Sequence, residues 1–160
     1  MKNEAMIGSQ IQGGDKIIKA ARVAHEKHRQ PTSDVSVATK QATSVTEEWQ
    51  ACVEKPENVL REVHIAEHLN ERIDVVDLAT ATAYEMKVSG KNADHEFYKD
   101  IFKVVVYNAH NREKKLRGLV FLTERRGVDD LNKGLGKAVQ DIINADVQYG
   151  FKVAVVSIRD

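Results

Sequence analysis

The 160-residue sequence has little of what would assign it to a particular compartment. Its one cysteine, Cys52, excludes an internal disulfide and is typical of a protein from a reducing compartment. No apolar run approaches the roughly 18 residues of a membrane span. The apolar core of a signal peptide is also missing from the first residues, MKNEAMIGSQIQGGDK. We therefore expect a soluble cytoplasmic protein.

The sequence also lacks a net charge. The 24 Lys and Arg residues balance 24 Asp and Glu residues, so bulk charge predicts no polyanionic partner. The distribution along the chain is uneven, with ten acids and three bases at 41–86, then ten bases and five acids at 87–126. Such segments could hold a cation beside an anionic substrate, or could be two solvated faces of opposite sign.

Proline is scarce, and each of the two prolines ends a predicted helix. A helix at 15–29, capped by Asp15, stops before Pro31, and a helix at 40–53 ends before Pro56. The first thirteen residues are polar and rich in glycine, so we expect them to be mobile.

Beyond Pro56, short apolar runs alternate with helical patterns. Strands are predicted at 58–65, 72–78, 83–89, 116–124 and 151–158, and helices at 92–110 and 129–150. In the helix at 92–110, Asp94 is the expected cap and Val105 is expected on the buried face. Without a repeat or a linker, this order predicts one α/β domain over 1–160, with a mixed central sheet of about five strands flanked by helices.

Two predicted strands carry acids among apolar residues, in the stretch RIDVVDLATATAYEMK. An acid inside an apolar strand is costly unless something binds it. If the strands pair as a hairpin, Asp74 comes beside Glu85, and Lys87 shares the face of Glu85 because strand side chains alternate. Two carboxylates suffice for Mg²⁺, and an ammonium can orient a water or stabilise charge on a phosphate. Asp77 lies nearer the turn and is expected to be structural.

The pattern Asp, short hairpin, Glu-x-Lys resembles the PD-(D/E)xK nuclease superfamily, whose fold is the restriction-endonuclease-like fold. The family order of helix, three antiparallel strands, helix and strand is similar to the order predicted over 40–124, although Ile73 replaces the proline. The resemblance implies an endonuclease that cleaves DNA and depends on Mg²⁺ or Mn²⁺. In it Asp74 and Glu85 would bind the metal and Lys87 would assist the attacking water.

Two further sets of site residues are predicted, one from the resemblance and one from charge spacing. Many family members place a glutamate on the helix before the strands, and Glu48 is preferred here, with Glu47 and Glu62 as alternatives. Downstream of the motif, Lys91, Lys99 and Lys103 are expected to contact DNA phosphates, with Lys99 and Lys103 on the side of their helix away from the apolar stripe.

Several alternatives stay open. Glu85 and Lys87 could belong to an ordinary exposed strand face, or the domain could be a catalytically silent binding or assembly module. The sequence HIAEH also matches the inverted zincin motif, in which His64, Glu67 and His68 on a helix would form a zinc peptidase site. Finally, a possible homodimer is predicted from one stripe of the helix at 129–150: Leu131, Leu135, Val139, Ile142 and Ile143.

Overall fold

The computed structural model describes the backbone of residues 2–159 and the side chains of residues 14–159. The chain forms two compact units, Met1–Val53 and Glu54–Asp160, and each is described by itself. The expectation of one domain over 1–160 stays a prediction. The expected mobility of the first thirteen residues lies outside the part of the chain whose side chains are described. No helix in the described residues is long and apolar enough to cross a membrane.

The first unit is a pair of helices, α1 (Lys2–His28) and α2 (Val35–Val53). They pack against each other, and the buried Trp49 of α2 donates its indole N–H to the carbonyl of Ile17 in α1 at 3.1 Å. The α2 helix begins five residues before the predicted start because Asp34 caps it, accepting the N–H groups of Ser36 and Val37 at 2.8 and 3.1 Å. Asp15, the predicted cap of the first helix, lies inside α1.

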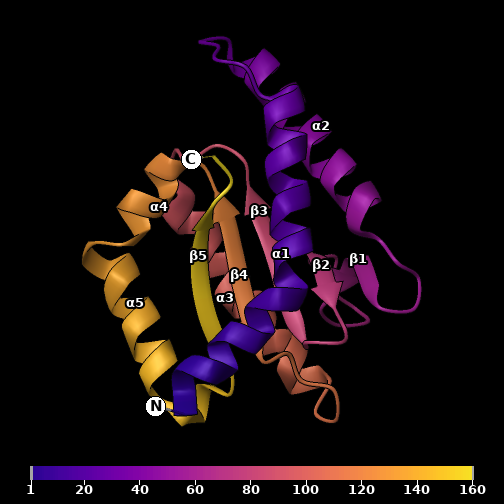
Figure 1. Cartoon of the computed structure of the whole chain (residues 1–160), viewed down its shortest axis with the longest axis vertical. Coiled ribbons are helices and arrows are strands. Elements are labelled where there is room, and N and C mark those ends of the chain that lie inside the picture. Colours follow the sequence, from indigo (N-terminus) through magenta and orange to yellow (C-terminus); the bar gives the residue numbers. More distant parts are fainter. Residues whose placement is uncertain (1, 160) are drawn as a thin grey trace. The chain divides into compact units, whose positions relative to one another are not determined.

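The second unit is built on a five-stranded sheet of order β1-β2-β3-β4-β5 (Figure 1). The strands β1 (Val59–His64), β2 (Arg72–Asp77) and β3 (Thr82–Lys87) are antiparallel. The strands β4 (Gly118–Thr123) and β5 (Lys152–Ser157) continue parallel to β3. The predicted α/β class with a mixed five-stranded sheet is confirmed.

The α3 helix (Ala93–His110) crosses from β3 to β4 and packs on β2, β3 and β4. Phe97, Ile101 and Val104 are buried against the sheet, and the ring of Phe97 lies edge-on to that of Phe121 in β4 with centroids 5.4 Å apart. Two expectations were wrong. Val105 is exposed, and the cap position is held by Asn92 in a left-handed conformation instead of Asp94.

The helix predicted at 129–150 is broken into α4 (Arg125–Leu131), α5 (Gly134–Ala145) and a short 3₁₀ turn, Val147–Tyr149. The break has two causes. Gly134 has φ +54°, a left-handed conformation that interrupts a helix, and a Cβ on Gly136 would lie 2.7 Å from the carbonyl oxygen of Leu131. The two glycines therefore let the chain turn sharply and bring α5 close to the end of α4.

Candidate functional site

Asp74 and Glu85 lie side by side across the β2–β3 hairpin, as the sequence predicted. Val75 pairs with Tyr84, so Asp74 lies opposite Glu85 on the same face of the sheet. Their carboxyl groups are within hydrogen-bonding reach of each other, and the N–H of Met86 donates to Asp74 Oδ2 at 2.9 Å. Because burial raises the pKa of both carboxyl groups, the pair holds a proton more readily than two exposed carboxyl groups would.

Two α3 side chains complete a buried cluster of charges around this pair. Lys103 Nζ donates to Glu85 Oε1 at 3.0 Å and lies 3.0 Å from Asp100 Oδ1. Glu85 and Asp100 are 2% and 4% exposed. Among the described residues, Asp100 Oδ1 receives no hydrogen bond of suitable angle, so its contact with Lys103 is an ion pair only. Three carboxyl groups thus surround one ammonium.

The excess of acid shifts the pKa values of the cluster. Burial, followed by the charges of Asp74 and Asp100, raises the pKa of Glu85 well above its ordinary range. Burial also raises the pKa of Asp74, and it raises the pKa of Asp100 to about 7. Burial alone would lower the pKa of Lys103, but the carboxylates of Glu85 and Asp100 raise it above its ordinary value. The site therefore favours additional positive charge, either protons or a cation.

Lys87 lies two residues beyond Glu85 on β3, so the alternation of strand side chains puts it on the same face. It is half-buried, and no described residue makes a hydrogen bond or ion pair with its ammonium. Lys103 neutralises Glu85 from α3, which leaves the Lys87 ammonium available to another group.

Of the three candidates for a fourth acid, only Glu62 lies in the same unit as the carboxylate pair. It sits on β1 opposite Asp74, between the pairs Arg61–Val75 and Val63–Ile73, and its charge contributes to the raised pKa of Asp74. Its backbone has φ +52°, a strained conformation for a residue other than glycine.

Glu48 and Glu47 belong to α2 of the first unit, whose position relative to the sheet is not defined. Within that unit the carboxylate of Glu48 already has two basic partners. Lys27 donates to it at 2.9 Å, and His28 also contacts it. The hydrogen bonds from Lys27 and His28 lower the pKa of Glu48. The preferred fourth acid is thus held in a local ion-pair cluster.

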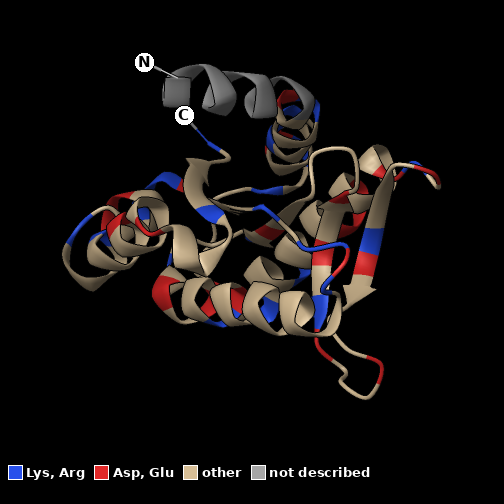
Figure 2. Ribbon diagram, turned by 90° about the horizontal axis from the view of Figure 1, so that it is seen from below, with Lys and Arg blue, Asp and Glu red and all other residues tan. Residues whose placement is uncertain are grey.

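The three lysines expected to contact phosphates have different environments. Lys91 is exposed, and Lys99 is exposed with an ion pair to Glu71 at 3.3 Å. Lys103 faces the sheet instead of solvent, so its expected place away from the apolar stripe was wrong. Lys and Arg positions are interspersed with Asp and Glu positions along the ribbon of the second unit (Figure 2).

Asp77 is structural, as expected. Its two carboxylate oxygens accept hydrogen bonds from the N–H of Ala79 at 3.0 Å and the hydroxyl of Thr80 at 2.9 Å. These contacts close the turn between β2 and β3, and they leave Asp74 as the acid that faces Glu85.

The helix that the inverted zincin motif requires does not form. His64 ends β1, and Glu67 and His68 lie in the turn that follows, so the two imidazoles lack helical spacing. A shallow pocket at this turn, lined partly by His64, Glu67 and His110, is separate from the carboxylate pair. In the described part of the chain, no group of three or more His, Cys, Asp or Glu side chains is placed to hold a metal ion.

Asp100 is the site residue that the sequence reasoning missed. The signal was present, because Phe97, Asp100, Ile101 and Val104 have the i, i+3, i+4, i+7 spacing of one buried helix face. An acid on such a stripe needs a partner, and Lys103 one turn later supplies it.

Comparison of the chain with family models, with curated proteins and with solved structures finds no match. The structure shows an α/β fold, and the resemblance to the nuclease superfamily depends on the residues of the hairpin and on the order of the elements.

Proposed function

We propose that this protein is a metal-dependent nuclease of the restriction-endonuclease-like type that hydrolyses phosphodiester bonds in DNA. The observation that carries the proposal is the β2–β3 register, which pairs Asp74 with Glu85 and puts Lys87 on their face. The element order supports it, because a helix, three antiparallel strands, a helix and a parallel strand follow one another as the resemblance implies.

Asp74 and Glu85 would hold the ion through their carboxylate oxygens. Asp74 Oδ2 accepts the Met86 N–H and Glu85 Oε1 accepts from Lys103, and these bonds orient the two carboxylates. Two carboxylate oxygens with water in the other positions suit Mg²⁺ or Mn²⁺, which keep several waters in protein sites. When bound, the ion would neutralise charge on the phosphate and activate a water.

The remaining charged residues have distinct roles in this proposal. Lys87 orients the attacking water or stabilises the charge that develops on the phosphate. Lys103 and Asp100 act through Glu85, because Lys103 fixes one Glu85 oxygen and Asp100 holds Lys103. Exposed Lys91 and Lys99 bind backbone phosphates, which provides affinity without sequence readout.

A second candidate is a nuclease-fold binding or assembly module without turnover. One contact favours it, because the ammonium of Lys103 already neutralises Glu85 and reduces the need for a metal cation. The two candidates differ in metal dependence, since the silent module would bind DNA equally well with and without a divalent cation.

The first test is the metal requirement. The full chain is incubated with supercoiled and linear DNA in Mg²⁺, Mn²⁺, Ca²⁺ or chelator. We expect cleavage in Mg²⁺ or Mn²⁺, DNA binding without turnover in Ca²⁺, and no cleavage in chelator. Robust cleavage in chelator would contradict the mechanism, and metal-independent DNA binding with no cleavage in any condition would favour the silent module.

The second test separates Lys87 from the fold. Lys87→Ala should lower the cleavage rate by at least ~100-fold, because a positioned proton-transfer or charge-stabilising group contributes about that much. Its unfolding midpoint should match the parent, since no described residue bonds to the Lys87 ammonium. Lys114→Ala, at an exposed loop position, is the matched control and should cleave at the parent rate. A Lys87→Ala protein as active as the parent would make Lys87 a surface residue only.

A further inference from the structure

The carboxyl ends of the three parallel strands meet at one edge of the sheet. Lys87 of β3, Thr123 of β4 and Ser157 of β5 lie side by side there, because Lys87 pairs with Thr123 and Thr123 pairs with Ser157. In open α/β sheets, ligands bind outside the carboxyl ends of the strands. Glu85 lies two residues before the end of β3, so this edge is close to the carboxylate pair. The segments that follow the strands are therefore placed to contact a substrate that reaches that pair.

Two of these segments, the turn after β3 and the junction between β4 and α4, pack closely against each other. Two long hydrogen bonds join them, from the N–H of Gly90 to Glu124 Oε2 at 3.4 Å and from the Thr123 hydroxyl to the carbonyl of Ser89 at 3.5 Å. A Cβ on Gly90 would lie 2.5 Å from the backbone nitrogen of Gly127, so this approach requires a glycine. The backbones of the two segments are therefore in direct contact.

Arg126 and Lys91 are the basic side chains that this contact brings together. The position that a Cβ on Gly90 would occupy is 3.3 Å from the Cβ of Arg126, and Lys91 is the next residue along the chain. Both side chains are exposed, and neither forms an ion pair with a residue that the structure describes. Two positive charges from segments far apart in the sequence thus lie at the same edge of the sheet as Lys87.

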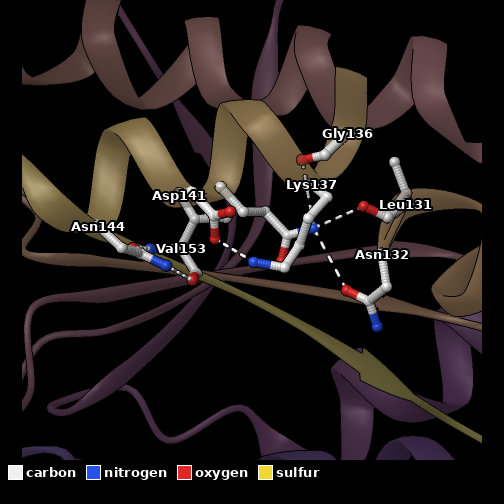
Figure 3. Close-up of polar contacts among 8 residues, drawn as sticks. Leu131, Asn132, Gly136, Lys137, Asp141, Asn144 and Val153 are labelled. Carbon is white, nitrogen blue, oxygen red and sulfur yellow. Dashed lines mark hydrogen bonds and ion pairs between the residues drawn. The ribbon is translucent and has the colours of Figure 1, made fainter. Parts of the chain in front are cut away.

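The other basic residues between 125 and 145 already have acidic partners. Each forms an ion pair with an acid three or four residues away: Arg125 with Asp129 at 3.2 Å, Lys133 with Asp130 at 2.9 Å, and Lys137 with Asp141 (Figure 3). The hydrogen bond from Lys133 and, to a lesser extent, the charge of Arg126 lower the pKa of Asp130. Because Asp130 pairs with Lys133, it neutralises Arg126 only in part.

We propose that Arg126 and Lys91 form a phosphate-binding cluster that holds the DNA backbone beside the cleavage site. This inference rests on the proposed function and extends its interface from the turn after β3 to the β4–α4 junction. A guanidinium can bind two phosphate oxygens at once, and an ammonium beside it adds a second positive charge. Gly90 is at most about 17 Å along the chain from Glu85, so the contacted phosphate lies within roughly five nucleotides of the scissile one.

The experiment measures DNA binding separately from cleavage. The full chain is titrated against a fluorescently labelled duplex of about 20 base pairs in Ca²⁺, at salt concentrations from about 50 to 300 mM. Arg126→Ala should weaken binding roughly fivefold to tenfold at about 100 mM salt. The slope of the logarithm of the binding constant against the logarithm of the salt concentration should become shallower by about one phosphate contact. Arg126→Lys keeps the charge and should keep the parent slope.

Arg125→Ala is the matched control. Arg125 is the neighbouring exposed arginine, and its loss changes the net charge equally, but its guanidinium already bonds to Asp129. Successive residues of a helix also point about 100° apart, so Arg125 does not share the direction of Arg126. This variant should bind DNA with the affinity and salt slope of the parent. Circular dichroism and the melting temperature establish that each variant is folded.

The outcomes separate this proposal from the nuclease activity. An Arg126→Ala protein with the parent affinity and slope would overturn the cluster, even if the parent cleaves DNA in Mg²⁺. An Arg125→Ala protein that loses as much affinity as Arg126→Ala would also overturn it, because net charge alone would then explain both. Weaker binding in Arg126→Ala, with a parent that never cleaves, would support the cluster and contradict the nuclease activity. A parent that binds no DNA would overturn both.

Discussion

Replacing Asp100 by Asn removes one negative charge from the buried cluster with almost no change in shape. The Asp100 side chain is 4% exposed, and its nearest charged partner is Lys103. Because Lys103 also bonds to Glu85, its ammonium keeps an acidic partner in the variant. The substitution therefore measures what it costs to ionise a third carboxyl group in the cluster.

The pKa of Asp100 rises from its ordinary value of 3.8 to about 7, chiefly through burial. This corresponds to up to roughly 4 kcal/mol between the protonated and ionised forms in the folded protein. A folded-state pKa above the unfolded value means that the stabilisation is fully present below about pH 4 and is lost as pH rises through 7. Asp100→Asn resembles the protonated form, so it should be more stable than the parent at pH 8 by up to that amount and nearly equal near pH 4.

Urea unfolding, followed by circular dichroism in chelator between pH 4.5 and 8.5, measures this difference. Asp94→Asn is the matched control, because Asp94 is an exposed acid on the same helix, and it should follow the parent within about 0.5 kcal/mol at every pH. Equal pH dependence in the parent and in Asp100→Asn would refute the reasoning, because it would mean that Asp100 is ionised in the folded protein without significant cost.

Two further predictions concern the ion and the nucleic acid. Mg²⁺ at ten times its dissociation constant should stabilise the parent by ~1.4 kcal/mol, a rise of a few degrees in melting temperature. Asp74→Asn should abolish this rise while still accepting the Met86 N–H, so an undiminished shift would exclude Asp74 as a ligand. In Ca²⁺, Lys91→Ala with Lys99→Ala should weaken DNA binding. The slope of the logarithm of the binding constant against the logarithm of the salt concentration should also become shallower, by the equivalent of up to about two phosphate contacts. An unchanged salt slope would exclude both lysines from the interface, and Lys114→Ala again serves as the exposed control.

The sequence alone determined the five strands of the second unit, the helix between β3 and β4, and the hairpin that pairs Asp74 with Glu85. These features are local. Alternating β-branched residues specify short strands, and a turn of a few residues between them fixes an antiparallel register. Asp77 could likewise be assigned to the turn from its position, because an aspartate there bonds to nearby backbone and hydroxyl groups.

Other features were wrong or missing because they depend on residues far apart in the chain. An exposed lysine and a buried one look the same in sequence, and only the packing of α3 on β3 turns Lys103 toward Glu85, eighteen residues away. The same packing places Asp100 in the site, beside Lys103.

The apolar stripe predicted at 129–150 was likewise divided by tertiary structure. Leu131 and Ile143 enter the core, whereas Leu135 and Ile142 face outward. The division follows from the break at Gly134 and from the hydrogen bonds of Gln140 to α4 and of Asn144 to β5, which set the rotation of α5. Sequence periodicity shows that a helix has an apolar side. Which of those residues the sheet covers depends on how the helix is anchored, and that is decided by contacts with other elements.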